Sequence, residues 1–149
     1  MAFAQRLQTL LAAAWAGVLI AVGGLVAPSL FAVLDRATAG LAAGRIFAVE
    51  AQVSVALAMV LFIIERQRGR QAVTTGQAGP SVMTAEVLLT LGALFATVLG
   101  HFALRPMMEA AKAGQGSWSF GALHAVSSSL FLFKGLLVLA LAWRLTGRR

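Results

Sequence analysis

Two histidines and one glutamate stand out because they lie inside long apolar runs. His101 is near the end of one run, His124 is near the start of the next, and Glu50 is within an earlier one. Imidazole and carboxylate groups bind Zn, Cu or Fe, and two imidazoles on facing helices can hold a haem iron. No close-spaced motif such as HExxH accompanies them, so hydrogen bonding of each histidine across helices is the alternative.

Lys134 adds a cation to the apolar stretch Phe120–Trp143. At 100° per residue, four polar side chains share one face of this stretch or its edge: His124, Ser127, Ser128 and Lys134. Because an ionisable group in hydrocarbon costs several kcal/mol, we expect this face to meet other helices or a wet cavity. Lys134 either reaches inward toward Glu86 or marks a charged cavity for an anionic ligand or a proton path.

A second polar face lies on the preceding apolar run, and its members are Glu86, Thr90, Thr97 and His101. Glu86 falls in the first turn, where the helix dipole favours an anion. Glu50 is followed one turn later by Ser54. Its carboxylate is either part of a ligand site or paired with Arg45 or another cation at the membrane boundary.

The composition restricts what these side chains belong to. Of 149 residues, 60% are hydrophobic and only 11% are charged, which favours a single membrane domain over a soluble one. The sequence has no cysteine, so disulfides, thiolate ligands and cysteine nucleophiles are excluded. The net charge is +7, but the basic residues flank apolar runs, so the predicted partner is the lipid bilayer and not nucleic acid.

Four apolar segments predict an all-α bundle of four transmembrane helices in one domain, 1–149. The helices are predicted at about 8–34, 39–64, 84–104 and 120–143, with a cytoplasmic polar linker at 65–80. The first run is too long for the apolar core of a signal peptide, so we expect a retained helix. Pro28 should kink this helix, and Thr38 is a candidate cap for the second.

Basic residues set the predicted orientation and the depth of the polar groups. In the four-helix arrangement seven basic residues lie on the side of the termini and four on the other, which places both termini in the cytoplasm. His101 and His124 then lie about 6 Å inside the outer boundary. Glu50 is about 7–8 Å inside it if the boundary is at Arg45, but about 18 Å if the helix starts at Thr38.

Four segments resemble a known family: WAGVLIAVGGLVAPSLF (15–31), AGLAAGRIF (39–47), GHFALRP (100–106) and HAVSS (124–128). They look like the bacterial membrane proteins called domain of unknown function 4149, which are similar to eukaryotic transmembrane protein 205. The resemblance implies a four-helix protein of the bacterial inner membrane. It extends distantly to the copper-resistance D proteins and to a haem-pathway membrane protein with intramembrane His and Lys. The scattered methionines, apart from Met107–Met108, argue against copper handling.

Three functions remain open at this point. The leading prediction is a non-enzymatic protein that binds a metal ion or haem near the periplasmic face through His101, His124 and Glu50. The second is a membrane oxidoreductase acting on a tetrapyrrole or quinone. The third is a structural or interaction subunit, with a homo-oligomer as one form, whose polar residues join helices. No nucleophile-elbow motif supports a hydrolase.

Overall fold

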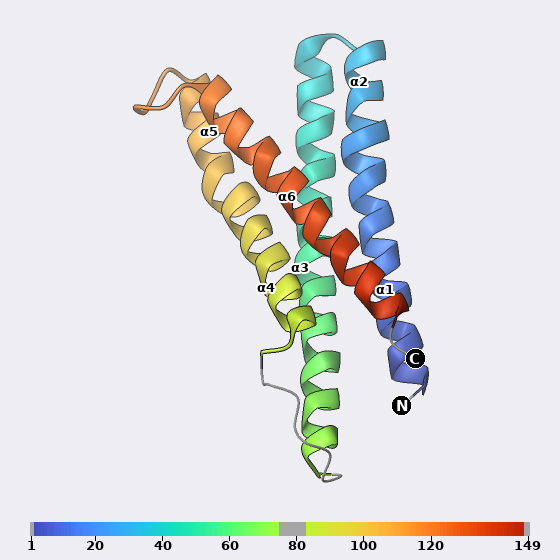
Figure 1. Ribbon diagram of the computed structural model, residues 1–149. Helices are drawn as coiled ribbons and strands as arrows, with labels where there is room; N and C mark the ends of the chain where they lie inside the picture. The colour runs from blue at the N-terminus through green and yellow to red at the C-terminus, as the bar shows by residue number, and fades with distance from the viewer. Residues whose placement is uncertain (1, 75–82, 148–149) are drawn as a thin grey trace.

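The computed structural model describes residues 2–74 and 83–147, and all regular structure within these ranges is helical. Four continuous helical rods are long and apolar enough to cross a membrane: Phe3–Val33, Arg36–Thr74, Ala85–Lys112 and Phe120–Thr146. This arrangement confirms the predicted all-α bundle of four membrane-spanning helices. The start of the first rod and the end of the last lie together, and we call this the inner end of the bundle (Figure 1).

The first rod changes its helical form before its proline. It consists of α1 (Ala2–Ile20), a π-helix η1 (Ala21–Val26) and α2 (Ala27–Val33). In η1 the turn is wider, and the N–H of Ala27 bonds to the carbonyl of Val22. Pro28 falls in the first turn of α2, where its missing N–H costs little. At the position of the predicted kink, the chain therefore widens into a π-helix.

The third rod repeats this arrangement and runs further than predicted. It consists of α4 (Ala85–Thr97), the π-helix η2 (Val98–Ala103) and α5 (Leu104–Lys112). The sequence predicts an end near residue 104, before Arg105–Pro106, but the helix continues to Lys112. Pro106 again follows a π-helix and lies in the first turn of the next α-helix. A proline in this position extends a helix rather than ending it.

The second rod is a single long helix, α3 (Arg36–Thr74), and its cap differs from the predicted one. Asp35, not Thr38, receives the first free N–H groups, from Ala37 and Thr38, each at 3.0 Å from Oδ1. Hydrogen bonding from the side chain of Thr38, and then from the backbone N–H groups of Thr38 and Ala37, stabilises the carboxylate form and holds the pKa of Asp35 below its usual value. A short acidic side chain immediately before a helix is the preferred cap.

The other end of α3 extends past Ile64 into the segment predicted as a linker. Residues 65–74 are helical, because they are rich in Arg and Gln, which favour helix, and contain no proline. The rest of the predicted linker, residues 75–82, lies outside the described part of the chain. Thr84 then caps α4 by accepting a hydrogen bond from the N–H of Val87 at 3.2 Å.

The four rods form a ring in which only neighbours pack closely. α6 (Phe120–Thr146) packs on α1 and α4, and α3 packs on the same two helices from the opposite side. α3 and α6 therefore face each other across the interior with no close backbone contact. The apolar core lies in the inner half and uses small residues together with larger ones, among them Ala12, Trp15, Ala58, Leu61, Ala93 and Leu141.

The outer half of the ring is more open than the inner half. There α2 packs on α3, while α5 packs on α6. Figure 1 shows α6 crossing the bundle obliquely, so that its first turns lie beside α5 and apart from α2. None of the residues of α2 is buried. The four rods thus pack together in the inner half and separate in the outer half into two pairs, α2 with α3 and α5 with α6.

Candidate functional site

The interior of the ring contains one ion pair, formed by Glu50 of α3 and Lys134 of α6. The ammonium nitrogen of Lys134 lies 2.8 Å from Oε1 and 2.9 Å from Oε2 of Glu50. The two side chains are only 3% and 4% exposed. Because α3 and α6 have no close backbone contact, these two long side chains connect opposite sides of the ring. We call Glu50 and Lys134 the central pair.

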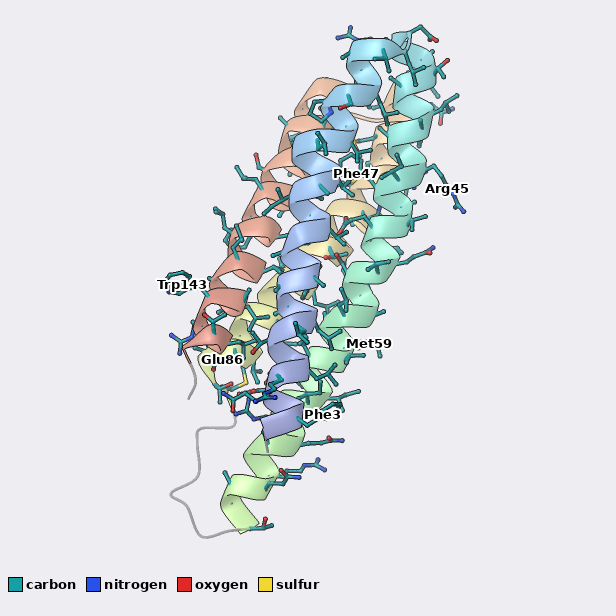
Figure 2. The ribbon with its side chains drawn as sticks, turned by 90° about the vertical axis from the view of Figure 1, so that its right-hand side faces the viewer. Phe3, Arg45, Phe47, Met59, Glu86 and Trp143 are labelled. Atoms are coloured by element: carbon teal, nitrogen blue, oxygen red, sulfur yellow. The ribbon has the colours of Figure 1, made fainter. Side chains whose placement is uncertain are left out.

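One of the two predictions for Lys134 was that it reaches inward toward Glu86. The structure gives Lys134 a different partner. Side chains on a helix point toward its N-terminus, and the N-terminus of α6 is at the outer end. Lys134 consequently reaches outward to Glu50, whereas Glu86 is bonded to Nε of Arg144 at 3.1 Å. Glu50 correspondingly pairs with Lys134 and not with Arg45, whose side chain points away from the bundle (Figure 2).

Two more side chains complete the hydrogen bonds around Glu50. The hydroxyl of Ser54, one turn along α3, donates to Oε1 of Glu50. The indole N–H of Trp15 in α1 then donates to that hydroxyl at 2.8 Å. Trp15 and Ser54 are fully buried. The carboxylate therefore receives hydrogen bonds that link three helices, as a charge in an apolar interior requires.

Aromatic rings line the central pair. The ring of Phe131 lies 4.9 Å from the ammonium nitrogen of Lys134, a cation–π distance. Phe47 meets Phe131 edge to face with ring centres 5.2 Å apart, and Figure 2 shows Phe47 between the first two rods. Gly23 of η1 lies against Phe131 so closely that an added Cβ would be 2.6 Å from Cε1. Apolar contact on this side strengthens the electrostatic attraction within the pair.

His101 lies beside this centre, in the π-helix η2. Its side chain is half-buried and lines an open depression of about 300 Å³ together with Phe102, Arg105, Pro106 and Glu109. The π-helix η2, which carries His101, packs on both α3 and α6, the helices of Glu50 and Lys134. The predicted face from Glu86 to His101 is only partly realised, because Glu86, Thr90 and Thr97 are buried and His101 is not.

His124 has different surroundings. It is exposed near the start of α6, where its ring stacks on Phe120 with centres 5.7 Å apart. The ammonium group of Lys112 lies 5.2 Å from the centre of the same Phe120 ring. Within the described residues no three His, Asp or Glu side chains gather as a metal site. The ligand set of His101, His124 and Glu50 stays a prediction.

The hydroxyl groups near the histidines bond mainly within or between helices. Ser127 donates to the carbonyl of Gly100 in η2 at 3.5 Å, whereas Ser128 is exposed. Thr97 donates to the carbonyl of Ala93, four residues back, at 2.8 Å. Bonds of this kind satisfy a hydroxyl in an apolar environment without a ligand. Ser127 is therefore the serine of α6 that contributes to helix packing.

A second polar group, which we call the inner cluster, lies at the inner end of the ring. Glu65 of α3 accepts hydrogen bonds from Gln8 of α1 at 3.0 Å and from Thr84 at 3.2 Å. Arg68 donates to Gln8 at 2.7 Å and lies 3.8 Å from Glu65. With the pair formed by Glu86 of α4 and Arg144 of α6, the inner cluster draws on all four rods.

Three of these buried polar residues were missed by the sequence reasoning: Gln8, Trp15 and Glu65. Gln8 falls in the lead-in to the first helix, and Glu65 is the first residue of the predicted linker. Both lie at the ends of apolar runs, where charges are usually solvated. Trp15 gave a clearer signal, since an indole in the middle of an apolar run requires a hydrogen-bond acceptor when it is buried.

The four membrane-spanning helices and the ion pair buried between them define a multi-pass membrane protein with a charged pair in its interior. Residues 10–117 match the family described as Domain of unknown function (DUF4149), and the chain belongs to this family. The match confirms the predicted family and does not include α6, which supplies Lys134. No curated protein and no solved structure matches the chain. The distant similarity to copper-resistance D proteins stays a prediction.

Proposed function

We propose that this protein is a non-enzymatic component of the bacterial inner membrane, with both termini in the cytoplasm, that binds a metal ion near the periplasmic face. The observation that carries this proposal is the position of His101. Its imidazole lines an open depression, and η2, which carries it, packs on α3 and α6, the two helices that supply the central pair. The proposed role of the bundle is to fix this site at a set depth below the outer surface.

The chemistry of the depression favours a metal ion over haem. His101 and Glu109 line the same depression, and the carboxylate of Glu109 also forms an exposed ion pair with Lys112 at 3.2 Å, which a bound metal ion would have to displace or share. This donor set suits a divalent transition metal with solvent at its other positions. A haem held by two histidines would also need His124, whose ring instead stacks on Phe120. The π-helical form of η2 adds support, because such segments are frequent at functional sites.

Elemental analysis together with an absorption spectrum tests this proposal on protein purified in mild detergent. Wild type should contain one metal ion per chain, His101→Ala should lose it, and His124→Ala should retain it. The second variant is the matched control, since it removes the only other imidazole of the chain. A metal-free wild type after extraction in metal-supplemented buffer would overturn the proposal. A Soret band lost in both variants would assign the site to haem instead.

A second candidate is the interaction subunit, and the satisfied polar interior favours it. Among the described residues, every buried polar side-chain atom has a hydrogen-bond partner. The polar residues of the core can therefore serve to join helices and need no ligand. His124 and Ser128 are exposed on membrane-spanning α6, where contact with a second copy of the chain would cover them. Cross-linking in native membranes that yields a homo-oligomer would support this candidate.

A role as an oxidoreductase stays a prediction. Turnover of a tetrapyrrole or quinone by the purified protein, retained in His124→Ala and lost in Lys134→Met under conditions where that variant is still folded, would support it over both candidates above.

A further inference from the structure

The inner end of α3 extends beyond the ring and out of the hydrocarbon. α3 has 39 residues and is about 58 Å long, whereas the hydrocarbon core of a bilayer is about 30 Å thick. Glu65 is the last buried residue of α3, and Figure 1 shows the helix continuing past the other rods. The headgroup layer of one leaflet is about 5–8 Å deep. Taking Glu65, the last buried residue, as the boundary of the hydrocarbon puts Arg66 and Arg70 about 2–8 Å beyond it along the helix and hence within this layer.

The arginines at this end fall into two groups according to their partners. Arg68 is bonded to Gln8 and lies 3.8 Å from Glu65, and Arg144 is bonded to Glu86. In the part of the chain that the structure describes, Arg66 and Arg70 form no ion pair. They are one turn apart on the same face of α3. Two like charges at this spacing repel each other unless an anion lies between or beside them.

A third arginine without an ion pair, Arg6 of α1, lies on a different face. Arg6 is exposed and forms no ion pair within the described residues. It is two residues, or about 200° of helix, from Gln8, whose side chain faces Arg68 of α3. Arg66 and Arg70 are each two residues from Arg68, so they point away from α1 as Arg6 points away from α3. We call Arg66 and Arg70 the arginine surface.

We propose that the arginine surface binds the phosphodiester headgroup of an anionic phospholipid, such as phosphatidylglycerol, from the leaflet at the inner end. Guanidinium groups bind phosphate oxygens in a bidentate manner, and the apolar residues Ile63 and Ile64 adjoin the surface where acyl chains begin. The depth of the arginines favours a lipid over a soluble acidic partner. This inference does not depend on the metal site proposed for His101.

The test compares two double variants of the full chain reconstituted with phosphatidylcholine and increasing phosphatidylglycerol. Arg66→Gln/Arg70→Gln removes two charges from the arginine surface. Arg36→Gln/Arg45→Gln removes two charges from the other end of the same helix and is the matched control. Native mass spectrometry of retained lipid and the thermal shift in each lipid mixture are the measurements. Unfolding in pure phosphatidylcholine shows whether each variant is folded.

Wild type and the control variant should retain phosphatidylglycerol in preference to phosphatidylcholine and gain thermal stability from it. Arg66→Gln/Arg70→Gln should lose about tenfold or more of this preference while unfolding normally in phosphatidylcholine. Inorganic phosphate should give no comparable shift. Equal losses in both variants, or no preference in wild type, would overturn the proposal. If the inner variant fails to fold, the single variants Arg66→Gln and Arg70→Gln replace it, and the same outcomes apply.

Discussion

The central pair and the inner cluster both place buried carboxylates between helices, but they differ in how many partners the carboxylates have and in how exposed those partners are. In the inner cluster, Glu65 and Glu86 share their contacts among partners from four rods, and Arg144 is 52% exposed. At the centre, Glu50 has a single cationic partner, and both side chains are almost fully buried. Loss of one partner therefore leaves the inner cluster with alternatives and leaves Glu50 with no compensating charge. Glu86 is as buried as Glu50, so the burial of the cation, and not that of the carboxylate or the number of ion pairs, separates the two regions.

The largest expected effect is at Lys134. Lys134→Met leaves the carboxylate of Glu50 buried without its cation, which should destabilise the protein by about 3–5 kcal/mol. Thermal unfolding in detergent measures this loss against wild type. A change of less than about 1 kcal/mol would mean that the pair is solvated, as surface pairs are.

A smaller effect is expected at Gly23, which lies against the aromatic side chain of Phe131, the residue that covers the central pair. Gly23→Ala places a methyl group 2.6 Å from Phe131 and should cost about 1–3 kcal/mol through overpacking. Gly24→Ala is the matched control, because nothing lies within 4 Å of its added Cβ. Equal unfolding temperatures for the two variants would show that η1 does not press on Phe131.

The inner cluster should tolerate the loss of a cation. Arg144→Gln removes one exposed partner of Glu86 and should cost no more than about 1 kcal/mol, because water reaches the guanidinium group. Added salt should weaken the wild-type interaction to a similar extent. A loss as large as that of Lys134→Met would remove the distinction between the two regions.

The smallest effect concerns Asp35 at the outer end of α3. Its folded pKa is lowered, so its contribution is complete above the unfolded pKa of about 3.9 and is lost as the pH falls through the folded pKa. Amide exchange at Ala37 and Thr38 should therefore accelerate in acid. Asp35→Asn keeps a capping side chain but should abolish this pH dependence. An unchanged pH profile in that variant would assign the effect to another group.

The sequence predicts the four apolar helices well because each follows from an uninterrupted run of side chains. The predicted ends after Ile64 and before Arg105 differ from the structure for local reasons. Arginine-rich segments remain good helix formers outside the membrane, and Pro106 follows a π-helix. A proline is recognisable in a sequence, but a π-helix before it is not.

The site was harder to predict, because it depends on how the helices cross. Helical stepping places His124 and Lys134 on one face of α6, yet the oblique path of that helix leaves His124 exposed while Lys134 is buried. His101 is displaced from the face of Thr97 because η2 begins at Val98 and changes the angle per residue. The sequence left several partners open for Glu50. The pairing with Lys134 follows only from the arrangement of the four rods, which places α3 and α6 on opposite sides of the interior.

A double-mutant cycle on Glu50→Gln and Lys134→Met tests the central claim most directly, which is that this pair connects α3 to α6 across the ring. Unfolding of wild type, both single variants and the double variant gives the coupling energy. The account predicts two destabilised single variants and a double variant that loses clearly less stability than the sum of the two, with a coupling of about 2–3 kcal/mol or more. Additive effects of the two substitutions would show that Glu50 and Lys134 do not interact and would contradict the account.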